Sequence, residues 1–250
     1  MSGNNGHLLY ESRDGVAVIT INRPDKRNAL SRAMCTALRD AWLRFRDSDT
    51  DRAAVLTAAG DLAFTAGADL RDLPDNLPDA LPEVGVALNK PVVAAVAGHV
   101  VGAGVTLVTF CDLCVAADNA RFLYPEARVG ATVGGIAALA ARVPHKIAME
   151  LMLLGEPISA QRAHEVGFVN RLVPAGTQVE TAVALARTMA GHAPLVLGAL
   201  KQLVRDTLPL SPMERYHRAR QVIDPVLSSD DMREGVAAFG EKRPPVFRGR

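Results

Sequence analysis

The chain has 250 residues, and its 28 basic and 27 acidic side chains give a formal net charge of +1 at pH 7. This even balance provides no electrostatic footprint for nucleic acid or for an anionic membrane, so it favours a function on small molecules. The first residues, MSGNNGHLL, have neither a basic nor an apolar segment, so we expect no targeting signal and a cytoplasmic location.

The first part of the chain predicts strands that alternate with a helix. Two strand-like runs within residues 7–22 predict a β-hairpin. Ser31 can cap a helix that runs to about Phe45 with an apolar stripe, and residues 53–58 form another short strand. The segment FTAGADL at residues 64–70 follows, and its small side chains let a ligand approach the backbone closely.

Residues 72–85, DLPDNLPDALPEVG, carry three evenly spaced prolines. Proline lacks a backbone N–H and breaks helices, so no long helix can run through this proline segment. We expect an irregular or mobile flap over the glycine-containing stretches on either side of it.

Residues 91–112, PVVAAVAGHVVGAGVTLVTFCD, contain three glycines and no charged side chain before Asp112 apart from what His99 carries. A transmembrane helix is the first interpretation, but no second such run occurs, and the β-branched start bounded by Pro and Gly predicts a short strand. A nucleotide site is the second, since strand, GxxxGxG and helix is the layout of a phosphate-binding turn. The spacing is similar to that of short-chain dehydrogenases, but the chain has no Tyr-x-x-x-Lys to supply their catalytic pair.

The third interpretation is a strand that turns sharply into a helix starting at about Ala103. The first N–H groups of a helix have no partner within it, so here they would point into a pocket. Such groups stabilise the negative charge that develops on an enolate or another oxyanion. This interpretation makes the stretch one side of an active site.

The three cysteines and six histidines give no metal or redox signature. Cys111 and Cys114 form a CxxC, but it lies in an apolar run typical of a core strand, and no second ligand pair stands at zinc spacing. The histidines are scattered, without a His-x-x-x-His or His-Cys pair. We therefore expect buried structural thiols and no metal site.

After Asp112 the chain continues as strands and then becomes helical. LCVAA and RFLY are strand-like, and the glycine-rich turn GATVGG opens a helix that ends near Val143. The remaining pattern predicts a strand at 168–173 and helices at 145–154, after Ser159, at 177–190, at 194–207, from 211 to a stop near Pro225, and a short one after Ser229. This order predicts an α/β fold, with a core over residues 1–190 and a C-terminal helical region over residues 191–250.

Several motifs occur in a fixed order over nearly the whole chain: RNALS, FTAGADL, KPVVAAVAG with GAG, CDL, YPE, SAQRAHEVGFVNRLVP and the ending EGVAAFGEKRPPVF. Together they resemble those of the crotonase superfamily, the enoyl-CoA hydratases and isomerases. The resemblance implies a crotonase-like spiral of ββα units and a C-terminal helical trimerisation region, commonly in a dimer of trimers. It also implies an acyl-CoA thioester as ligand and no cofactor beyond the CoA of the substrate.

The resemblance also assigns roles position by position. It places an oxyanion hole at the backbone N–H groups of Ala68 and Ala103, which would polarise a thioester carbonyl and stabilise the enolate. The family's usual glycine at the second position is alanine here, which leaves the N–H in place. The resemblance implies CoA contacts at Ala29, Leu30, Ala66, Leu70 and Lys242. From the sequence alone, Lys242 is equally well explained as a lysine exposed to solvent.

One departure from the family pattern concerns the reaction. Hydratases of this family use two glutamates on either side of a water; aligned on GAG, the first position is Thr106 and the second is Glu126. Thr106, grouped here with the substrate-binding residues, cannot act as a base near neutral pH, so the hydratase pair is incomplete. A single carboxylate can still shuttle a proton between the α- and γ-carbons, as the family's Δ3,Δ2-enoyl-CoA isomerases are understood to do.

Alternatives exist for these carboxylates and for the function. Glu126 could be the ion-pair partner of Arg128 or Arg121, and the acids of the proline segment are either solvated loop charges or replacements for the missing glutamate: Asp72, Asp75 and Glu83. The glycine-rich turn is shorter than the family's usual run and lacks its proline, so a reshaped pocket wall near Glu126 is expected. The sequence predicts an acyl-CoA isomerase or hydratase first, a non-catalytic acyl-CoA-binding protein second and a purely structural role third.

Overall fold

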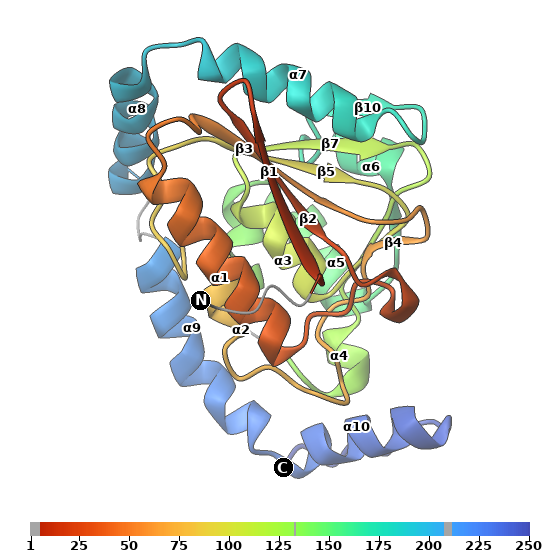
Figure 1. The fold of residues 1–250 in the computed structure, drawn as a ribbon. Helices are drawn as coiled ribbons and strands as arrows, with labels where there is room; N and C mark the ends of the chain where they lie inside the picture. The colour runs from red at the N-terminus through yellow and green to blue at the C-terminus, as the bar shows by residue number, and fades with distance from the viewer. Residues whose placement is uncertain (1–5, 133, 208–211) are drawn as a thin grey trace.

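The computed structural model describes residues 6–132, 134–207 and 212–250. Its larger sheet has the strand order β1-β2-β3-β5-β7-β10, and only β1 and β2 pair antiparallel (Figure 1). These strands are β1 (Leu8–Arg13), β2 (Val16–Ile21), β3 (Ala53–Ala58), β5 (Val92–Val96), β7 (Leu113–Ala117) and β10 (Arg171–Val173). The predicted N-terminal hairpin is therefore confirmed, and it forms one edge of the sheet.

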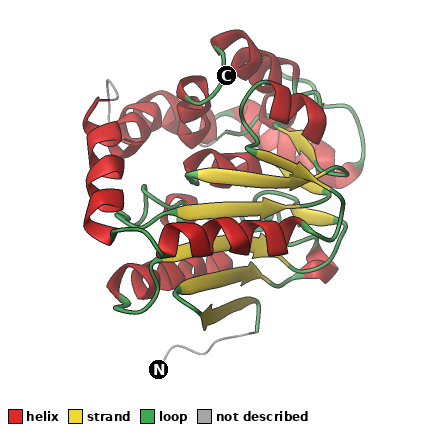
Figure 2. Cartoon of the chain, turned by 90° about the horizontal axis from the view of Figure 1, so that it is seen from above, coloured by secondary structure: helices red, strands yellow, loops and turns green. Residues whose placement is uncertain are grey.

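Helices bury both faces of this sheet. The predicted helix α1 (Arg32–Asp47) is capped by Ser31 and packs Leu38 and Trp42 into the main core together with Leu56 of β3. The helix α7 (Gln178–Ala190) lies across the other face, above the strands in Figure 1, where Ala186 packs in a second cluster with Val55. Seen from above, the strands lie side by side with helices around them (Figure 2). Strands that are buried on both faces have nearly continuous apolar sequences, as β3 and β5 do.

A second, four-stranded sheet has the order β4-β6-β8-β9 and carries the turns that concern function. Its strands are β4 (Ala63–Thr65), β6 (His99–Val101), β8 (Arg121–Leu123) and β9 (Ile158–Ser159). Directly after β6 comes the helix α3 (Ala103–Phe110), in which every residue is buried. The stretch 91–112 is thus β5, β6 and α3, so the predicted helix start at Ala103 is confirmed and a single membrane-spanning helix there is excluded.

The proline segment is not a flap. It contains only one short helix, α2 (Leu77–Ala80), as its prolines require, but its apolar side chains are buried in the main core, among them Leu77, Leu81 and Val84. The indole N–H of Trp42 in α1 donates to the carbonyl of Ala80 at 2.8 Å. The expectation failed because evenly spaced prolines exclude a helix but do not prevent the leucines between them from packing.

Further short helices lie between the strands of the two sheets. They are the 3-10 helix η1 (Pro24–Lys26) early in the chain, then α4 (Glu126–Val129), the 3-10 helix η2 (Gly134–Ala141), α5 (His145–Leu154) and α6 (Ala160–Glu165). The α-helix expected after GATVGG is η2 instead. Glycine is a poor α-helix former, and here Gly134 serves close packing, since a Cβ on it would lie 2.3 Å from the Cβ of Ala219.

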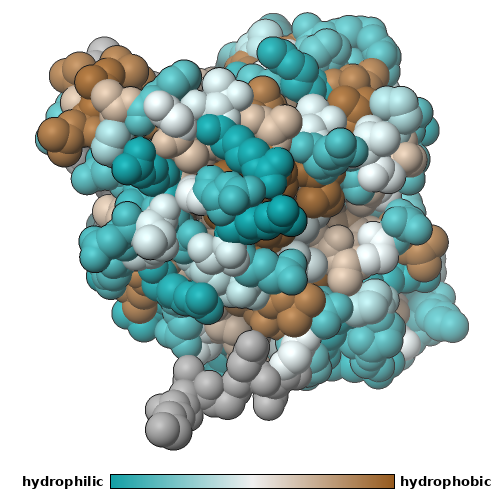
Figure 3. Space-filling view, turned by 45° about the horizontal axis from the view of Figure 1, so that its top comes forward, coloured by the Kyte–Doolittle hydropathy of each residue, from teal (hydrophilic) through white to brown (hydrophobic). Residues whose placement is uncertain are grey.

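The last helices are α8 (Pro194–Thr207), α9 (Pro212–Leu227) and α10 (Asp230–Glu241). The helix α9 ends at Leu227, two residues past the expected stop near Pro225, because a proline in the last turn removes only one helical hydrogen bond. The expected start at residue 211 lies outside the described residues, and α10, predicted to be short, has 12 residues. Several apolar side chains of α8 are exposed, and Figure 3 shows an apolar patch at the corner where α8 lies: Leu195, Val196, Leu200, Leu203 and Val204.

Candidate functional site

The loop after β4 presents a backbone N–H without an acceptor. Ala68 forms a bridge with Leu30, in which the Leu30 N–H donates to the Gly67 carbonyl and the Asp69 N–H donates to the Leu30 carbonyl, both at 2.8 Å. The N–H of Ala68 lies between these two bonds, and nothing in the described part of the chain accepts it. Because Gly67 has φ of +90°, the chain can turn here so that this N–H is left free.

The start of α3 presents a second free N–H close by. Ala103 is the first residue of the helix, so its N–H has no partner within α3, and none is found among residues 6–132, 134–207 and 212–250. A Cβ on Gly67 would lie 3.7 Å from the nitrogen of Ala103 and 3.1 Å from the carbonyl oxygen of Val101. The two loops therefore touch, and glycine at position 67 permits their contact.

Glu126 lies against the same helix start. It begins α4, and a Cβ on Gly102 would lie 2.5 Å from Oε1 of its carboxyl group. The other oxygen, Oε2, is buried and has no hydrogen-bond partner within the described ranges. Burial disfavours the charged form and raises the pKa of Glu126 to about 8. The protonated form of the carboxyl is therefore favoured at neutral pH.

The alternative role for Glu126, an ion pair with Arg128 or Arg121, is wrong. The guanidinium of Arg128 donates to the carbonyl of Gly155 at 3.1 Å, and that of Arg121 donates to the carbonyl of Ala120 at 2.8 Å. Neither forms a salt bridge with Glu126. A buried, unpaired carboxyl is costly to maintain for stability alone, so this position is a candidate for proton transfer.

Glu126 lines a cavity of about 730 Å³. The cavity lies between α4, the loop before η2, the end of α9 and the chain after α10, and its wall includes Tyr124, Thr132, Ile136, Met152, Val226 and Phe247. Most of these side chains are apolar, which suits an acyl chain. The site thus has two free N–H groups, one carboxyl and an apolar cavity that begins at that carboxyl.

Thr106 lies one turn further along α3 and is fully buried. Its hydroxyl is 3.5 Å from the carbonyl oxygen of Gly102, and a Cβ on Gly135 would lie 2.9 Å from its methyl carbon. The same Cβ would lie 3.3 Å from Leu81 and 3.4 Å from Phe110. The side chain at position 106 is therefore enclosed by apolar groups.

Substitution of Thr106 by glutamate is expected to destabilise the protein rather than create a second catalytic carboxylate. The longer, charged side chain would overpack the space beside Gly135 and bury a carboxylate without a partner, at about 1–3 kcal/mol for the overpacking alone. The free energy of unfolding, from urea titration, checks this, with the nearly isosteric Thr106→Val as control. A stable Thr106→Glu variant with new hydratase activity would contradict this description of the site.

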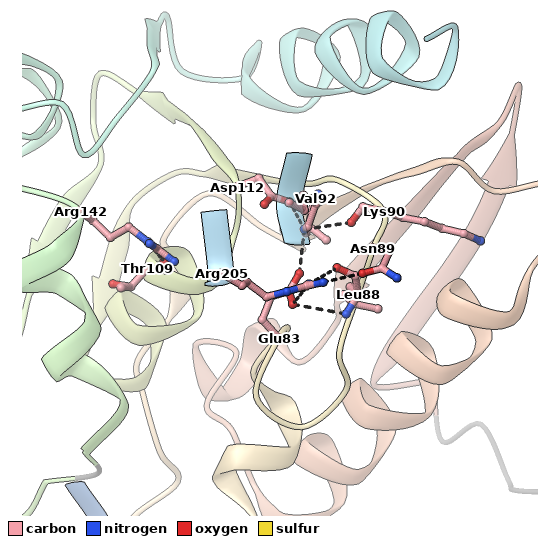
Figure 4. Close-up of polar contacts among 10 residues, drawn as sticks. Glu83, Leu88, Asn89, Lys90, Val92, Thr109, Asp112, Arg142 and Arg205 are labelled. Carbon is pink, nitrogen blue, oxygen red and sulfur yellow. Dashed lines mark hydrogen bonds and ion pairs between the residues drawn. The ribbon is translucent and has the colours of Figure 1, made fainter. Parts of the chain in front are cut away.

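The acids of the proline segment do not supply a second carboxylate. Glu83 is an ion-pair partner of Arg205 of α8 at 2.8 Å (Figure 4). It also pairs with Lys201 of α8 at 2.8 Å, and its side chain is only 9% exposed. The solvated-charge interpretation is therefore wrong for Glu83, because two cations distant in sequence enclose it. Asp75 is an exposed ion-pair partner of Arg32, and Asp72 accepts the Arg32 N–H at 3.3 Å. None of the three acids lines the cavity that contains Glu126.

The structure brings together four of the five predicted CoA-contact residues. The Leu30–Ala68 bridge holds the loop of Ala29 against the loop that carries Ala66 and Leu70, and the Ala66 N–H donates to the Arg27 carbonyl at 2.9 Å. Leu30 is fully buried, and its N–H and carbonyl are both bonded to the loop of Ala68, so it holds the two loops together. The fifth, Lys242, is exposed at the C-terminal end of α10.

Asn28 positions these loops, and the sequence reasoning missed it. Its buried side chain donates to the carbonyls of Ala59 and Ala63 at 2.9 and 2.8 Å, and accepts the Arg23 N–H at 2.9 Å. Asn28 has φ of +57°, a conformation that asparagine tolerates better than most residues. The polar asparagine within RNALS was the sequence signal that could have indicated this role.

Tyr124, the residue before PE, and Thr132 were also missed.

The remaining predictions concern cysteines, metals and membranes. Cys111 and Cys114 are buried free thiols, as predicted, and burial raises the pKa of both. Within the described ranges, no group of three or more His, Cys, Asp or Glu side chains could hold a metal ion. In the same ranges no single helix has the length and apolarity to span a membrane, although α7 and α8, bent by 105°, pass that test as a pair on length and composition.

Comparison with known proteins gives consistent matches over the full length. The sequence model of the enoyl-CoA hydratase/isomerase family matches residues 11–250. A 2,3-dehydroadipyl-CoA hydratase of Escherichia coli K12 is 36% identical, and the match covers 97% of this chain and 99% of the relative. A carnitinyl-CoA dehydratase of Salmonella typhi is 37% identical over 97% and 98% of the two chains. The crystal structure of a carnitinyl-CoA hydratase from Mycobacterium avium superposes with a TM-score of 0.89 at 35% identity, covering 98% and 99%.

Proposed function

Because the chain belongs to the enoyl-CoA hydratase/isomerase family of the crotonase superfamily, we propose that it is an enzyme that moves a proton on the acyl chain of a CoA thioester. The N–H groups of Ala68 and Ala103 would bind the thioester carbonyl and stabilise the enolate that forms when a proton leaves the α-carbon. Glu126 would accept that proton and return it to the chain. The CoA moiety would contact Ala29, Leu30, Ala66 and Leu70, and Lys242 would reach a phosphate.

The observation that carries this proposal is the placement of Glu126 directly beside the helix start that provides the Ala103 N–H, with Thr106 in the other carboxylate position. One carboxyl can remove a proton from the α-carbon and deliver it to the γ-carbon, which shifts a double bond. Hydration also requires a group that takes a proton from water. The site therefore favours isomerisation of 3-enoyl-CoA to 2-enoyl-CoA.

Hydration or dehydration is the second candidate, because relatives that match over the full length are named as a hydratase and as dehydratases. Of the described residues that line the cavity, Asp231 is the carboxylate besides Glu126. Its two oxygens accept the backbone N–H groups of Arg248 and Gly249 at 2.6 and 2.7 Å, so it is committed to holding the chain end. Asp231 would have to exchange these bonds for a water molecule to serve in hydration.

The decisive experiment compares two substrates with the purified protein. Double-bond migration is followed with a trans-3-enoyl-CoA and hydration with a trans-2-enoyl-CoA, each by product analysis. Migration without hydration supports the proposal. Hydration at an enzymatic rate that Asp231→Asn abolishes would replace it with the second candidate, and tight binding without turnover of either substrate would indicate a non-catalytic acyl-CoA-binding protein.

The rate of isomerisation is expected to rise with pH. Glu126 must be ionised to accept a proton, and burial raises its pKa to about 8. We expect kcat/KM to increase about tenfold per pH unit below pH 8 and to level off above it, since kcat/KM reports the ionisation of the free enzyme. A pH-rate profile from about pH 6 to about pH 9.5 checks this. A profile that is flat across that range would show that an ionised Glu126 does not limit the reaction.

The exposed apolar residues of α8 support an oligomer. Five apolar side chains on one helix, each more than half exposed, form the kind of patch that subunit contacts cover. We propose a homotrimer, or a dimer of trimers, in which residues 191–250 form the contacts, with residues 1–190 as the core. Light scattering after size-exclusion chromatography measures the mass, and replacing Leu200 by glutamate should lower it to that of a monomer.

A further inference from the structure

Two hydroxyl groups form a pair on the wall of the cavity that contains Glu126. The phenol oxygen of Tyr124 is 2.7 Å from Oγ1 of Thr132, and both residues line the cavity. Tyr124 is only 3% exposed, whereas Thr132 is partly exposed. Tyr124 is separated from Glu126 by a single proline, so the pair lies beside the proposed proton-transfer group.

The pair has hydrogen-bonding capacity that the described residues do not use. Two hydroxyls carry two hydrogens, and their mutual bond consumes one of them. The other hydrogen has no acceptor among the described residues, and lone pairs on both oxygens are also free. Both residues line the cavity, so a ligand bound there can supply the partner that this O–H requires.

The charges around the cavity indicate what kind of partner fits. Arg250 is the one cation among the described lining residues; its side chain is 68% exposed and lies 3.7 Å from the Asp230 carboxylate. The carboxylate of Asp231 is already bonded to backbone N–H groups. Burial and the nearby Glu126 both raise the pKa of Tyr124, so negative charge is disfavoured here. An uncharged partner is favoured over a carboxylate.

We propose that the cavity binds an acyl chain that carries a hydroxyl group, held by the Tyr124–Thr132 pair. A hydroxyl substituent accepts the free O–H and donates to a free lone pair, whereas a keto oxygen can only accept. The substrate class, resting on the function proposed above, is then a hydroxylated enoyl-CoA whose hydroxyl lies beyond the carbons that exchange a proton with Glu126. The other polar contacts of the acyl chain would be those of its thioester carbonyl.

Binding of unreactive, saturated ligands tests this independently of turnover. Isothermal titration calorimetry compares hexanoyl-CoA with hexanoyl-CoA ligands that carry a hydroxyl at successive carbons beyond the γ-carbon, and with the ligand that ends in a carboxylate. We expect the best hydroxylated ligand to bind about 3- to 10-fold more tightly than hexanoyl-CoA, the worth of one or two neutral hydrogen bonds. The carboxylate ligand should bind more weakly than both.

Two variants locate the effect. Thr132→Val keeps the shape of the side chain and Tyr124→Phe keeps the ring, and each should reduce the affinity ratio of hydroxylated to plain ligand to about one. Thr188→Val, on the exposed side of α7, removes a hydroxyl elsewhere and should leave the ratio at the wild-type value. The ratio is informative even if one variant is less stable, since both ligands are measured on the same protein.

The outcomes separate this inference from the function on which it rests. Equal binding of plain and hydroxylated ligands, preference for the carboxylate, or a preference that survives both variants would overturn the hydroxyl site while the isomerase proposal stands. If no acyl-CoA ligand binds at all, the proposed function itself fails and the hydroxyl site fails with it.

Discussion

Glu126→Gln is expected to reduce the rate of double-bond migration by about 10²- to 10⁴-fold, because the amide cannot accept the proton that leaves the α-carbon. The affinity for acyl-CoA should change little, since glutamine keeps the size of the side chain. Single-turnover rates and dissociation constants measured on the same preparation check both parts. The matched control is Glu156→Gln, which makes the same chemical change on an exposed loop.

The same variant should become more stable than the wild type as the pH rises. The folded-state pKa of Glu126 is about 8, above the 4.5 of an ordinary glutamate, so its stabilising contribution is complete below about pH 4.5 and is lost as the pH rises toward 8. Glutamine does not carry this penalty. We expect the difference in free energy of unfolding to grow by at most about 1.4 kcal/mol per pH unit across that window. Full turnover by Glu126→Gln, or a stability difference independent of pH, would contradict the role proposed for this carboxyl.

Ala103→Pro is expected to reduce kcat by about 10²- to 10³-fold, because proline has no N–H and removes one of the two donors to the thioester oxygen. Proline is tolerated at the first position of a helix, where the N–H has no helical partner, so α3 should still form. Far-UV circular dichroism and the unfolding midpoint verify this.

Ala103→Gly is the control for the missing donor. Glycine keeps the N–H and is the residue that the family resemblance leads one to expect at this position, so this variant should lose far less activity than Ala103→Pro. Equal losses in both variants would show that the effect comes from packing at the start of α3 and not from the N–H group.

Local signals explain which parts of the fold could be predicted. The hairpin, the Ser31 cap of α1 and the start of α3 depend on residues within a few positions of each other, and all three are confirmed. The burial of the proline segment and the pairing of Glu83 depend on partners far along the chain, the Glu83–Arg205 pair spanning 122 residues. Sequence patterns that extend over one turn or one strand contain no information about such contacts.

The candidate site divides in the same way. The positions of Ala68, Ala103 and Glu126 followed from motifs, because family resemblance fixes the backbone around them. The raised pKa of Glu126 could not be foreseen, since it arises from how completely the folded chain excludes water from that carboxyl. The Tyr124–Thr132 contact was equally hidden, because it closes across α4 and the glycine turn that follows it.

The ion pairs of Glu83 have a consequence for biosynthesis. Until α8 has left the ribosome, Lys201 and Arg205 cannot reach Glu83, so the proline segment carries an uncompensated charge next to leucines that need burial. A nascent chain that ends before residue 201 should therefore expose this segment to proteases and chaperones even when the strands before it have paired. Docking of α8 would then complete the burial of the proline segment, so folding would be completed late in translation.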